Sequence, residues 1–191
     1  PCFVLDLTAT PKKESNIISY VDAVQLKNEH MVKLPVIVYN RDSQSEVLID
    51  AIDLRNKLEE IAGAEYAKTG KYIRPIALFQ AQPKGKEDAT TFEKLRDKLV
   101  DKGIPAEQIA IRTADVNELK NTDLMSPSCP IRYIITVNAL KEGWDCPFAY
   151  ILASLANKTS QVDVEQILGR ILRLPHTSQH TQSALNMSYV L

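Results

Sequence analysis

The sequence predicts an α/β protein in which helices flank a parallel β-sheet. Short apolar runs recur along the chain, and amphipathic stretches of helical period lie between several of them. The composition is that of a globular domain, because 45% of the residues are hydrophobic and 25% are charged. The 191 residues suit one domain of ordinary size, or one domain with a fragment of its neighbour.

Seven apolar runs are expected to form strands, because each is short, rich in aliphatic or aromatic residues, and bounded by polar or turn-forming residues. In chain order they are Phe3–Leu7, Val36–Asn40, Ile76–Gln80, Ile109–Arg112, Tyr133–Val137, Tyr150–Ser154 and Ser188–Leu191. Five of the seven follow residue 70. Residues 71–191 are therefore expected to form one compact domain.

Three stretches predict helices. Glu46–Lys68 reads as a long helix, and Lys86–Asp101 reads as a second that ends near Gly103. Val162–Arg173 reads as a third, which Pro175 stops because the residue before a proline avoids the helical region. Residues 12–70 are then a linker and a lead-in helix to the compact domain.

The net charge and the cysteine content bear on possible partners and on the cellular compartment. The net charge is −1, so binding to nucleic acid would need a local basic surface. Three cysteines lie far apart without metal-ligand spacing, which favours free thiols and a cytoplasmic protein. No apolar stretch approaches the roughly 20 residues of a membrane span, and we expect no contact with a membrane.

The segment Gln166–Arg173 reads Gln-x-x-Gly-Arg-x-x-Arg. On a helix, Gln166, Arg170 and Arg173 fall within roughly 60° of one another, and apolar residues occupy the opposite face. Arginine offers a planar fork of donors and keeps its charge, so two of them on one face suit a polyanion such as a phosphate chain. An ordinary surface helix with a solvated basic edge explains this window alone equally well.

Polar residues also follow the predicted strands. Gln80 ends one strand, Thr136 and Asn138 end another, and the Gln166–Arg173 helix follows the Tyr150–Ser154 strand. Ligands of parallel sheets sit beyond the carboxyl ends of the strands, so we expect these segments to meet at one edge. Each polar residue taken singly could equally be a cap that satisfies local amides.

Four segments occur in the order of helicase motifs. Thr8–Pro11 looks like motif III, Ile76–Gln80 like motif IV, Ile135–Pro147 like motif V, and Gln166–Pro175 like motif VI. Together they resemble the second motor domain of superfamily 2 helicases and translocases. The wording Lys-Glu-Gly-Trp-Asp-Cys-Pro in the motif V segment is most similar to the nuclease/ATPase subunit of type III restriction enzymes.

The resemblance implies a RecA-like fold and an ATP site shared with a first motor domain. Arg170 and Arg173 match the motif VI arginines, which would neutralise charge on the γ-phosphoryl oxygens. Gln166 would bind near the phosphates or the attacking water. Asp145 matches the motif V acid, expected near the ribose hydroxyls or a motif VI arginine, and Gly143 would let the backbone turn beside it.

The resemblance also implies nucleic acid as a partner. Gln80, Thr136 and Asn138 match positions that grip one strand through its phosphodiester backbone, which positions the protein without reading sequence. Thr8 and Thr10 match the segment that couples the nucleotide state to this grip. The expected partners are DNA, with RNA possible, the first motor domain and the modification subunit of a restriction complex.

The chain lacks a Gly-x-x-x-x-Gly-Lys-[Ser/Thr] phosphate loop and an acidic box after an apolar strand. We therefore expect residues 1–11 to be the end of a first motor domain, which would hold the phosphate loop and the Mg²⁺ that accompanies ATP. The isolated chain is expected to bind nucleotide weakly and not to hydrolyse it. A nuclease site, if the parent protein has one, is expected downstream.

Two weaker candidates are interpreted as ordinary surface. Asp115, Glu118 and Lys120 are crowded into one stretch, unlike a nuclease centre, and His176 and His180 have zinc-ligand spacing but no nearby partner ligand. Two alternatives to the restriction-enzyme motor remain: another superfamily 2 helicase acting on DNA or RNA, and a non-catalytic nucleic-acid-binding module of the same fold. The presence of both Arg170 and Arg173 argues against the latter, because a pure binding module does not need arginine fingers.

Overall fold

The computed structural model describes residues 14, 16–82, 90–137, 145–155, 168–169 and 171–191. A six-stranded sheet in the order β1-β6-β5-β2-β4-β3 organises these residues, and each neighbouring pair of strands is parallel. The predicted α/β class with a parallel sheet is therefore confirmed. The strands are β1 (Val36–Val38), β2 (Ile76–Gln80), β3 (Ile109–Arg112), β4 (Tyr133–Thr136), β5 (Ala149–Ser154) and β6 (Ser188–Val190).

Three α-helices that lie wholly within the described residues have clear sequence signals at their ends. They are α1 (Ala23–Asn28), α2 (Gln44–Thr69) and α3 (Phe92–Asp101). Asp22, Ser43 and Thr91 cap the first turns by accepting hydrogen bonds from backbone amides. Helix α2 stops at Gly70, whose φ of 71° suits glycine because it has no Cβ to clash. Short 3₁₀ turns η1 (Ala106–Gln108), η2 (Pro175–Thr177) and η3 (Ser183–Asn186) complete the described elements.

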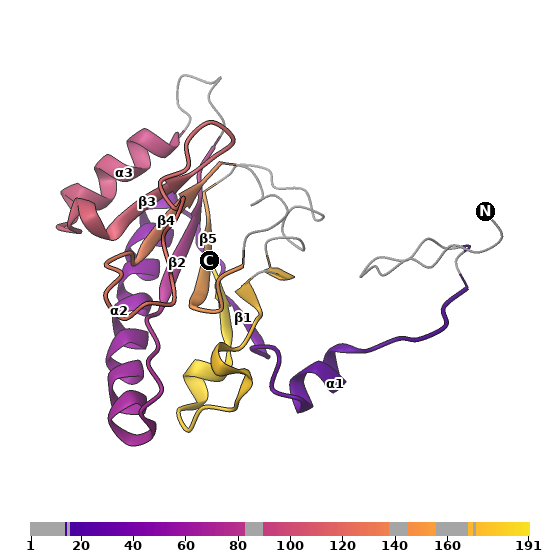
Figure 1. Cartoon of the computed structure of the whole chain (residues 1–191). Coiled ribbons are helices and arrows are strands. Elements are labelled where there is room, and N and C mark those ends of the chain that lie inside the picture. Colours follow the sequence, from indigo (N-terminus) through magenta and orange to yellow (C-terminus); the bar gives the residue numbers. More distant parts are fainter. Residues whose placement is uncertain (1–13, 15, 83–89, 138–144, 156–167, 170) are drawn as a thin grey trace.

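Helices α2 and α3 lie on the same side of the sheet (Figure 1). Helix α2 connects β1 to β2 and α3 connects β2 to β3, and both connections run in the same direction across the strand order. Because crossovers between parallel strands are right-handed, two crossovers in one direction place their helices on one face. The segment that carries α1 extends away from this body.

The core is centred on β2. All five of its residues are buried, and Phe79 stacks on Tyr133 of β4 with ring centroids 6.3 Å apart. A parallel strand buried on both faces reads as a continuous apolar run, as Ile76–Phe79 does. Leu58 of α2 and Leu95 of α3 cover one face, and Ile171 belongs to the same core.

A buried arginine ties a long connection to this core. Arg74 is 1% exposed, and its Nε donates to the Ile131 carbonyl at 2.9 Å. Its two Nη atoms donate to the carbonyls of Ser126, at 2.8 Å, and Leu124, at 2.5 Å. The guanidinium thereby holds the segment between β3 and β4, which contains no described helix, against the start of β2.

The predicted strands after residue 30 all occur, with ends within two residues of the predicted ones. Helix α3 begins at Phe92 and not at Lys86, because Thr91 caps it in an extended conformation. The third helix is described only at Leu168, Gly169 and Ile171, and Arg173 pairs with Val32 in an antiparallel bridge, so the predicted helix ends before Arg173. The predicted strand Phe3–Leu7 lies outside the described residues.

Part of the predicted lead-in belongs to the sheet itself. Strand β1 pairs with β6, and residues such as Ala51 and Leu58 of α2 are buried in the common core. No helix among the described residues is both long enough and apolar enough to cross a membrane.

Candidate functional site

Asp145 and Arg173 bring together the two segments that resemble motifs V and VI. The Nη1 atom of Arg173 donates to Oδ2 of Asp145 at 2.5 Å. Both side chains remain open to solvent, with exposed fractions of 62% for Arg173 and 41% for Asp145. An exposed pair of this kind adds at most about 1 kcal/mol to stability, so its consequence is the orientation of the guanidinium.

Backbone pairing fixes the position of Arg173. The Lys33 amide donates to the Leu172 carbonyl at 2.5 Å, and the Leu174 amide donates to the Met31 carbonyl at 2.9 Å. These bonds form a short antiparallel connection between the segment before β1 and the segment after Ile171. Arg173 lies at its centre, and its backbone partner is Val32.

Lys33 contacts the chain on either side of this pair, next to Asp145 and next to Arg173. Its side chain is fully buried, and Nζ donates to the carbonyls of Pro147, at 2.8 Å, and Ala149, at 2.7 Å. The ammonium also lies 4.1 Å from the centroid of the Tyr150 ring, a cation–π contact. Burial lowers the Lys33 pKa to about 7, although the nearby Cys146 and Asp145 act to raise it.

Cys146 is buried beside Lys33 and Asp145. Burial raises its thiol pKa to about 11, which outweighs the opposing effect of the Lys33 charge. A thiol with this pKa stays protonated near neutral pH, and the thiolate is the nucleophilic form. Cys146 is 0% exposed and packs in the core.

The carboxyl edge of the sheet carries a buried polar network. Gln80 is 5% exposed and accepts a hydrogen bond from the Ser154 hydroxyl at 3.2 Å. Gln82 donates to the Leu155 carbonyl at 3.0 Å and accepts from the Thr90 amide at 3.0 Å. Thr136 is 1% exposed. Gln80 and Thr136, predicted to grip a nucleic-acid strand, are thus covered by the protein in this structure.

Arg173 and the Gln80 network do not share an edge. Asp145 precedes β5, so the Asp145–Arg173 pair lies at the amino ends of the strands, whereas Gln80 and Ser154 end their strands. The expectation of one common edge is wrong for Arg173. A segment that leaves the carboxyl end of a strand and returns to the next parallel strand must cross the sheet, and its far end reaches the amino edge.

Six predicted site residues lie outside the described residues. They are Thr8, Thr10, Asn138, Gly143, Gln166 and Arg170. The structure places the other four predicted residues, Gln80, Thr136, Asp145 and Arg173. Of these, Asp145 and Arg173 form a pair.

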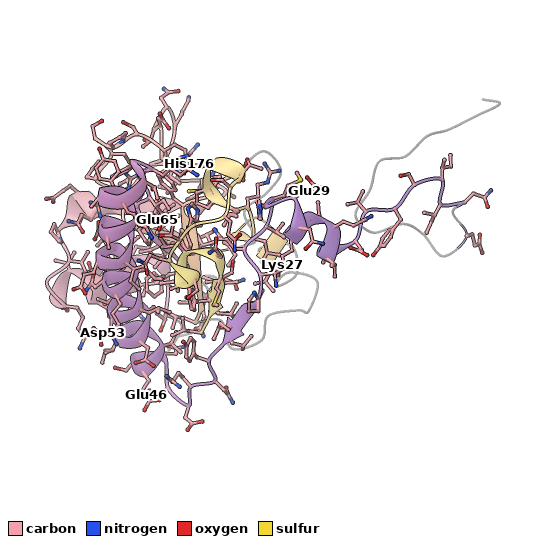
Figure 2. The ribbon with its side chains drawn as sticks, turned by 90° about the horizontal axis from the view of Figure 1, so that it is seen from below. Lys27, Glu29, Glu46, Asp53, Glu65 and His176 are labelled. Carbon is pink, nitrogen blue, oxygen red and sulfur yellow. The ribbon has the colours of Figure 1, made fainter. Side chains whose placement is uncertain are left out.

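His180 is buried, which corrects its interpretation as a surface-loop residue, whereas His176 is exposed as expected. His180 is 3% exposed, and its Nδ1 lies 3.7 Å from Oε1 of the buried Glu65 on α2. Glu65 accepts hydrogen bonds from the Thr181 hydroxyl and amide and from the Gln182 amide, which draw this segment onto α2. Figure 2 shows Glu65 beside the segment that carries His176.

No described residues form a metal centre: within the described ranges, no group of three or more His, Cys, Asp or Glu side chains could hold an ion. Glu118 has other contacts, since its carboxylate accepts from Arg96 at 3.1 Å and from the Ile111 amide at 2.7 Å. Glu118 therefore connects α3 to β3.

A cavity of about 230 Å³ lies between α2 and α3. None of the predicted site residues lines it. Its lining residues are Gln44, Ser45, Leu48, Leu95, Lys98, Asp101, Lys102 and Leu155.

The sequence prediction omitted Lys33, although one signal was available. Lys33 interrupts the run Met-Val-Lys-Leu-Pro-Val-Ile-Val-Tyr, which is otherwise apolar. A single charged residue in such a run is either exposed at a bend or buried with a dedicated set of partners. The two carbonyls and the Tyr150 ring are those partners.

No protein-family model matches the chain, and no curated protein matches it. A function for this chain therefore has to be argued from its own residues and their geometry.

Proposed function

We propose that the chain contains the second RecA-like motor domain of a nucleic-acid-dependent ATPase of superfamily 2, most similar to the motor of type III restriction enzymes. The domain supplies arginines to an ATP site that it shares with a first motor domain. The observation that carries the proposal is the contact between Asp145 and Arg173. This contact joins the two segments whose sequences resemble motifs V and VI.

The geometry of the pair suits an arginine that acts on a phosphate. Arg173 is 62% exposed, so its donors can reach a ligand outside the domain. Asp145 uses one side of the guanidinium and limits its rotation. Arginine binds phosphate oxygens through its planar fork, and an oriented fork loses less freedom on binding. Arg170 is proposed to act with Arg173, as in the motif VI pattern.

ATP chemistry in this proposal is divided between two domains. The first motor domain would hold the β- and γ-phosphates and Mg²⁺, which neutralises charge on the phosphate chain. This chain would contribute Arg173 and Arg170 from the other side of the cleft. Gln166 and Gly143 retain the roles that the resemblance implies.

The buried carboxyl edge refines the proposed contact with nucleic acid. Gln80 and Thr136 are covered, so we propose that they stabilise the strand ends from within and do not touch phosphates. Gln82 extends this network by holding Thr90 and Leu155. DNA is the proposed nucleic acid, and RNA is the outcome that would favour another superfamily 2 helicase.

ATP hydrolysis by the intact polypeptide that contains this chain tests the proposal. The wild type is compared with Arg170→Ala and Arg173→Ala, with and without duplex DNA, and nucleotide binding is measured alongside. We expect kcat to fall by about 10³-fold for a principal arginine finger, with binding largely kept. Arg96→Ala is the matched control, because Arg96 is also an arginine paired with a carboxylate, on α3.

Two results would contradict the proposal. Hydrolysis at the wild-type rate in both variants would exclude an arginine-finger role. Absence of DNA-stimulated hydrolysis in the wild type, together with DNA binding, would instead favour the non-catalytic binding module. Stimulation by RNA and not DNA would retain the motor and change its substrate.

A further inference from the structure

Lys33 contacts both segments that make the candidate site. Through its side chain it binds the Pro147 and Ala149 carbonyls, which follow Asp145 in the chain. Through its backbone it binds the Leu172 carbonyl, which precedes Arg173. One residue from the segment before β1 thus binds one of the two segments through its side chain and the other through its backbone.

We propose that Lys33 is a positioning residue that holds Asp145 and Arg173 in contact and sets the orientation of the Arg173 guanidinium. The catalytic consequence rests on the proposed function, whereas the structural coupling does not. Lys33 touches neither of the two paired groups in a described hydrogen bond, so it acts through the backbone on either side of them.

The contacts of Lys33 are specific to its ammonium group. An Nζ that is fully buried must satisfy its donors internally, and two of them have carbonyl partners at 2.8 and 2.7 Å. The carbonyls belong to residues 147 and 149, on either side of Phe148, so the ammonium fixes the entry into β5. Phe148 is itself 1% exposed. Movement of this entry would move Asp145.

Lys33 gains or loses its proton near neutral pH. Because burial lowers its pKa to about 7, the ammonium and the amine are both populated there. Losing the proton weakens the attraction to the two carbonyls and to the Tyr150 ring, because a charged donor bonds more strongly than a neutral one. The entry into β5 is then less firmly held.

Three titratable groups near Lys33 have pKa values that burial moves away from neutral pH. Burial raises the pKa of Cys146 to about 11 and raises the pKa of Tyr150 well above its ordinary value. Burial lowers the pKa of His180 to about 4, and the charge of Lys33 adds a smaller lowering. The other charged groups nearby are the Asp145 carboxylate and the guanidiniums of Arg173 and Arg74.

Nuclear magnetic resonance of the 191-residue chain tests the coupling without ATP. The Lys33 Cε signal is assigned by its loss in Lys33→Met, and the Arg173 Nε–Hε signal by its loss in Arg173→Lys. Both are followed from about pH 6 to about pH 8.5. We expect both signals to titrate with one midpoint near 7, and the Arg173 titration to vanish in Lys33→Met.

A matched control separates positioning from a general loss of stability. Lys71→Met removes another lysine whose Nζ makes a side-chain hydrogen bond, to Ser178 at 2.8 Å, and should leave both titrations unchanged. An Arg173 signal that does not change with pH in the wild type would overturn the proposal. So would an Arg173 titration that persists in Lys33→Met. If Lys33→Met does not fold, unequal Lys33 and Arg173 midpoints in the wild type overturn it equally.

The pH profile of ATP hydrolysis by the intact polypeptide tests the catalytic consequence. In the wild type and in Lys71→Met we expect kcat to fall roughly tenfold between about pH 6.5 and pH 8.5, with little change in KM. The profile of Lys33→Met should be flat over this range. A flat profile in the wild type would overturn the catalytic consequence. Absence of hydrolysis at every pH would reject the proposed function, while the resonance data would still decide whether Lys33 positions Arg173.

Discussion

Lys33 and Arg74 are fully buried cations whose described hydrogen-bond acceptors are mainly backbone carbonyls and not carboxylates. Carbonyls are held in place by the chain, so a cation that binds several of them fixes the path of the backbone. Arg74 fixes the connection from β3 to β4, and Lys33 fixes the entry into β5. Removing either cation would leave buried acceptors without donors, each at a cost of about 1–3 kcal/mol.

His180 gives a second prediction about a single residue, concerning the pH dependence of stability. Neither ring nitrogen has a hydrogen-bond partner among the described residues, and burial lowers the His180 pKa to about 4, although Glu65 opposes the shift. The folded state therefore binds the proton less tightly than the unfolded state, whose pKa is about 6.5. The stabilising effect of neutral His180 is complete above pH 6.5 and is lost as the pH falls toward 4.

We expect the free energy of unfolding to fall by up to about 3 kcal/mol more in the wild type than in His180→Leu between about pH 6.5 and pH 4. Urea unfolding at a series of pH values measures the difference. The hydrogen bonds that Glu65 accepts are present in both proteins, whereas its attraction to protonated His180 exists only in the wild type and makes the difference smaller. Its own pKa is lowered because hydrogen bonds from Thr181 and Gln182 outweigh the opposing effect of burial. If the free energy of unfolding changed with pH equally in the two proteins, protonation of His180 would not destabilise the fold.

The sequence predicted which residues meet at the candidate site better than it predicted how deeply the polar residues are buried. The resemblance placed Asp145 near either the ribose or a motif VI arginine, and the structure shows the contact with Arg173. It gave no sign that Gln80 and Thr136 are buried, because a polar residue at a strand end has the same local pattern whether it caps the strand or faces a ligand. Burial depends on segments that are distant in sequence.

Among the described elements, the strands were predicted closely, whereas α1 was not predicted and the third helix was predicted to end too late. Continuous apolar runs identify buried parallel strands, so β2 and β3 have the predicted ends. Helix α1 has six residues and a capping box at Asp22, and it is too short to show a helical period. The segment after Ile171 leaves the helical pattern because the Lys33 and Leu174 amides take part in pairing with distant backbone.

The attachment of the C-terminal segment to α2 gives a prediction at this scale. Glu65→Leu would leave the Thr181 hydroxyl and amide and the Gln182 amide without their acceptor. We expect amide hydrogen exchange in residues 180–187 to become roughly 10- to 100-fold faster, while β2 stays protected. Hydrogen exchange read by mass spectrometry measures both regions at once.

Glu60→Leu is the matched control for this change. Glu60 lies on the same helix and is exposed, so its replacement should leave exchange in residues 180–187 unchanged. Equal acceleration in both variants would mean that α2 itself is weakened. Unchanged exchange in Glu65→Leu would mean that apolar contacts, such as that of the buried Leu185, hold the segment without Glu65.

For the whole molecule, the sheet order joins distant parts of the chain. Strand β1 pairs with β6, and Val36 is the partner of Ser188. Helix α2 contributes buried residues to the core that β2, β4 and β5 share. A continuous core of this kind favours unfolding in a single cooperative step.

We therefore expect residues 36–191 to unfold as one unit. Native-state hydrogen exchange should give the same free energy of opening for the slowest amides of α2 and β3, within about 1 kcal/mol. Thiol labelling of Cys129 and Cys146, both buried, should report the same unfolding transition. A lower opening free energy for α2 alone would support a separate lead-in segment over residues 12–70.

The position of β6 also sets a limit on when the sheet can be completed during protein synthesis. β6 is a strand of three residues, Ser188–Val190, that lies between β5 and β1. While a ribosome still encloses these residues, β1 has no neighbour in the sheet and β5 has an open edge. Open edges of this kind are prone to pair with other chains. A nascent chain stalled just before β6 would therefore be at its most vulnerable to association with its neighbours.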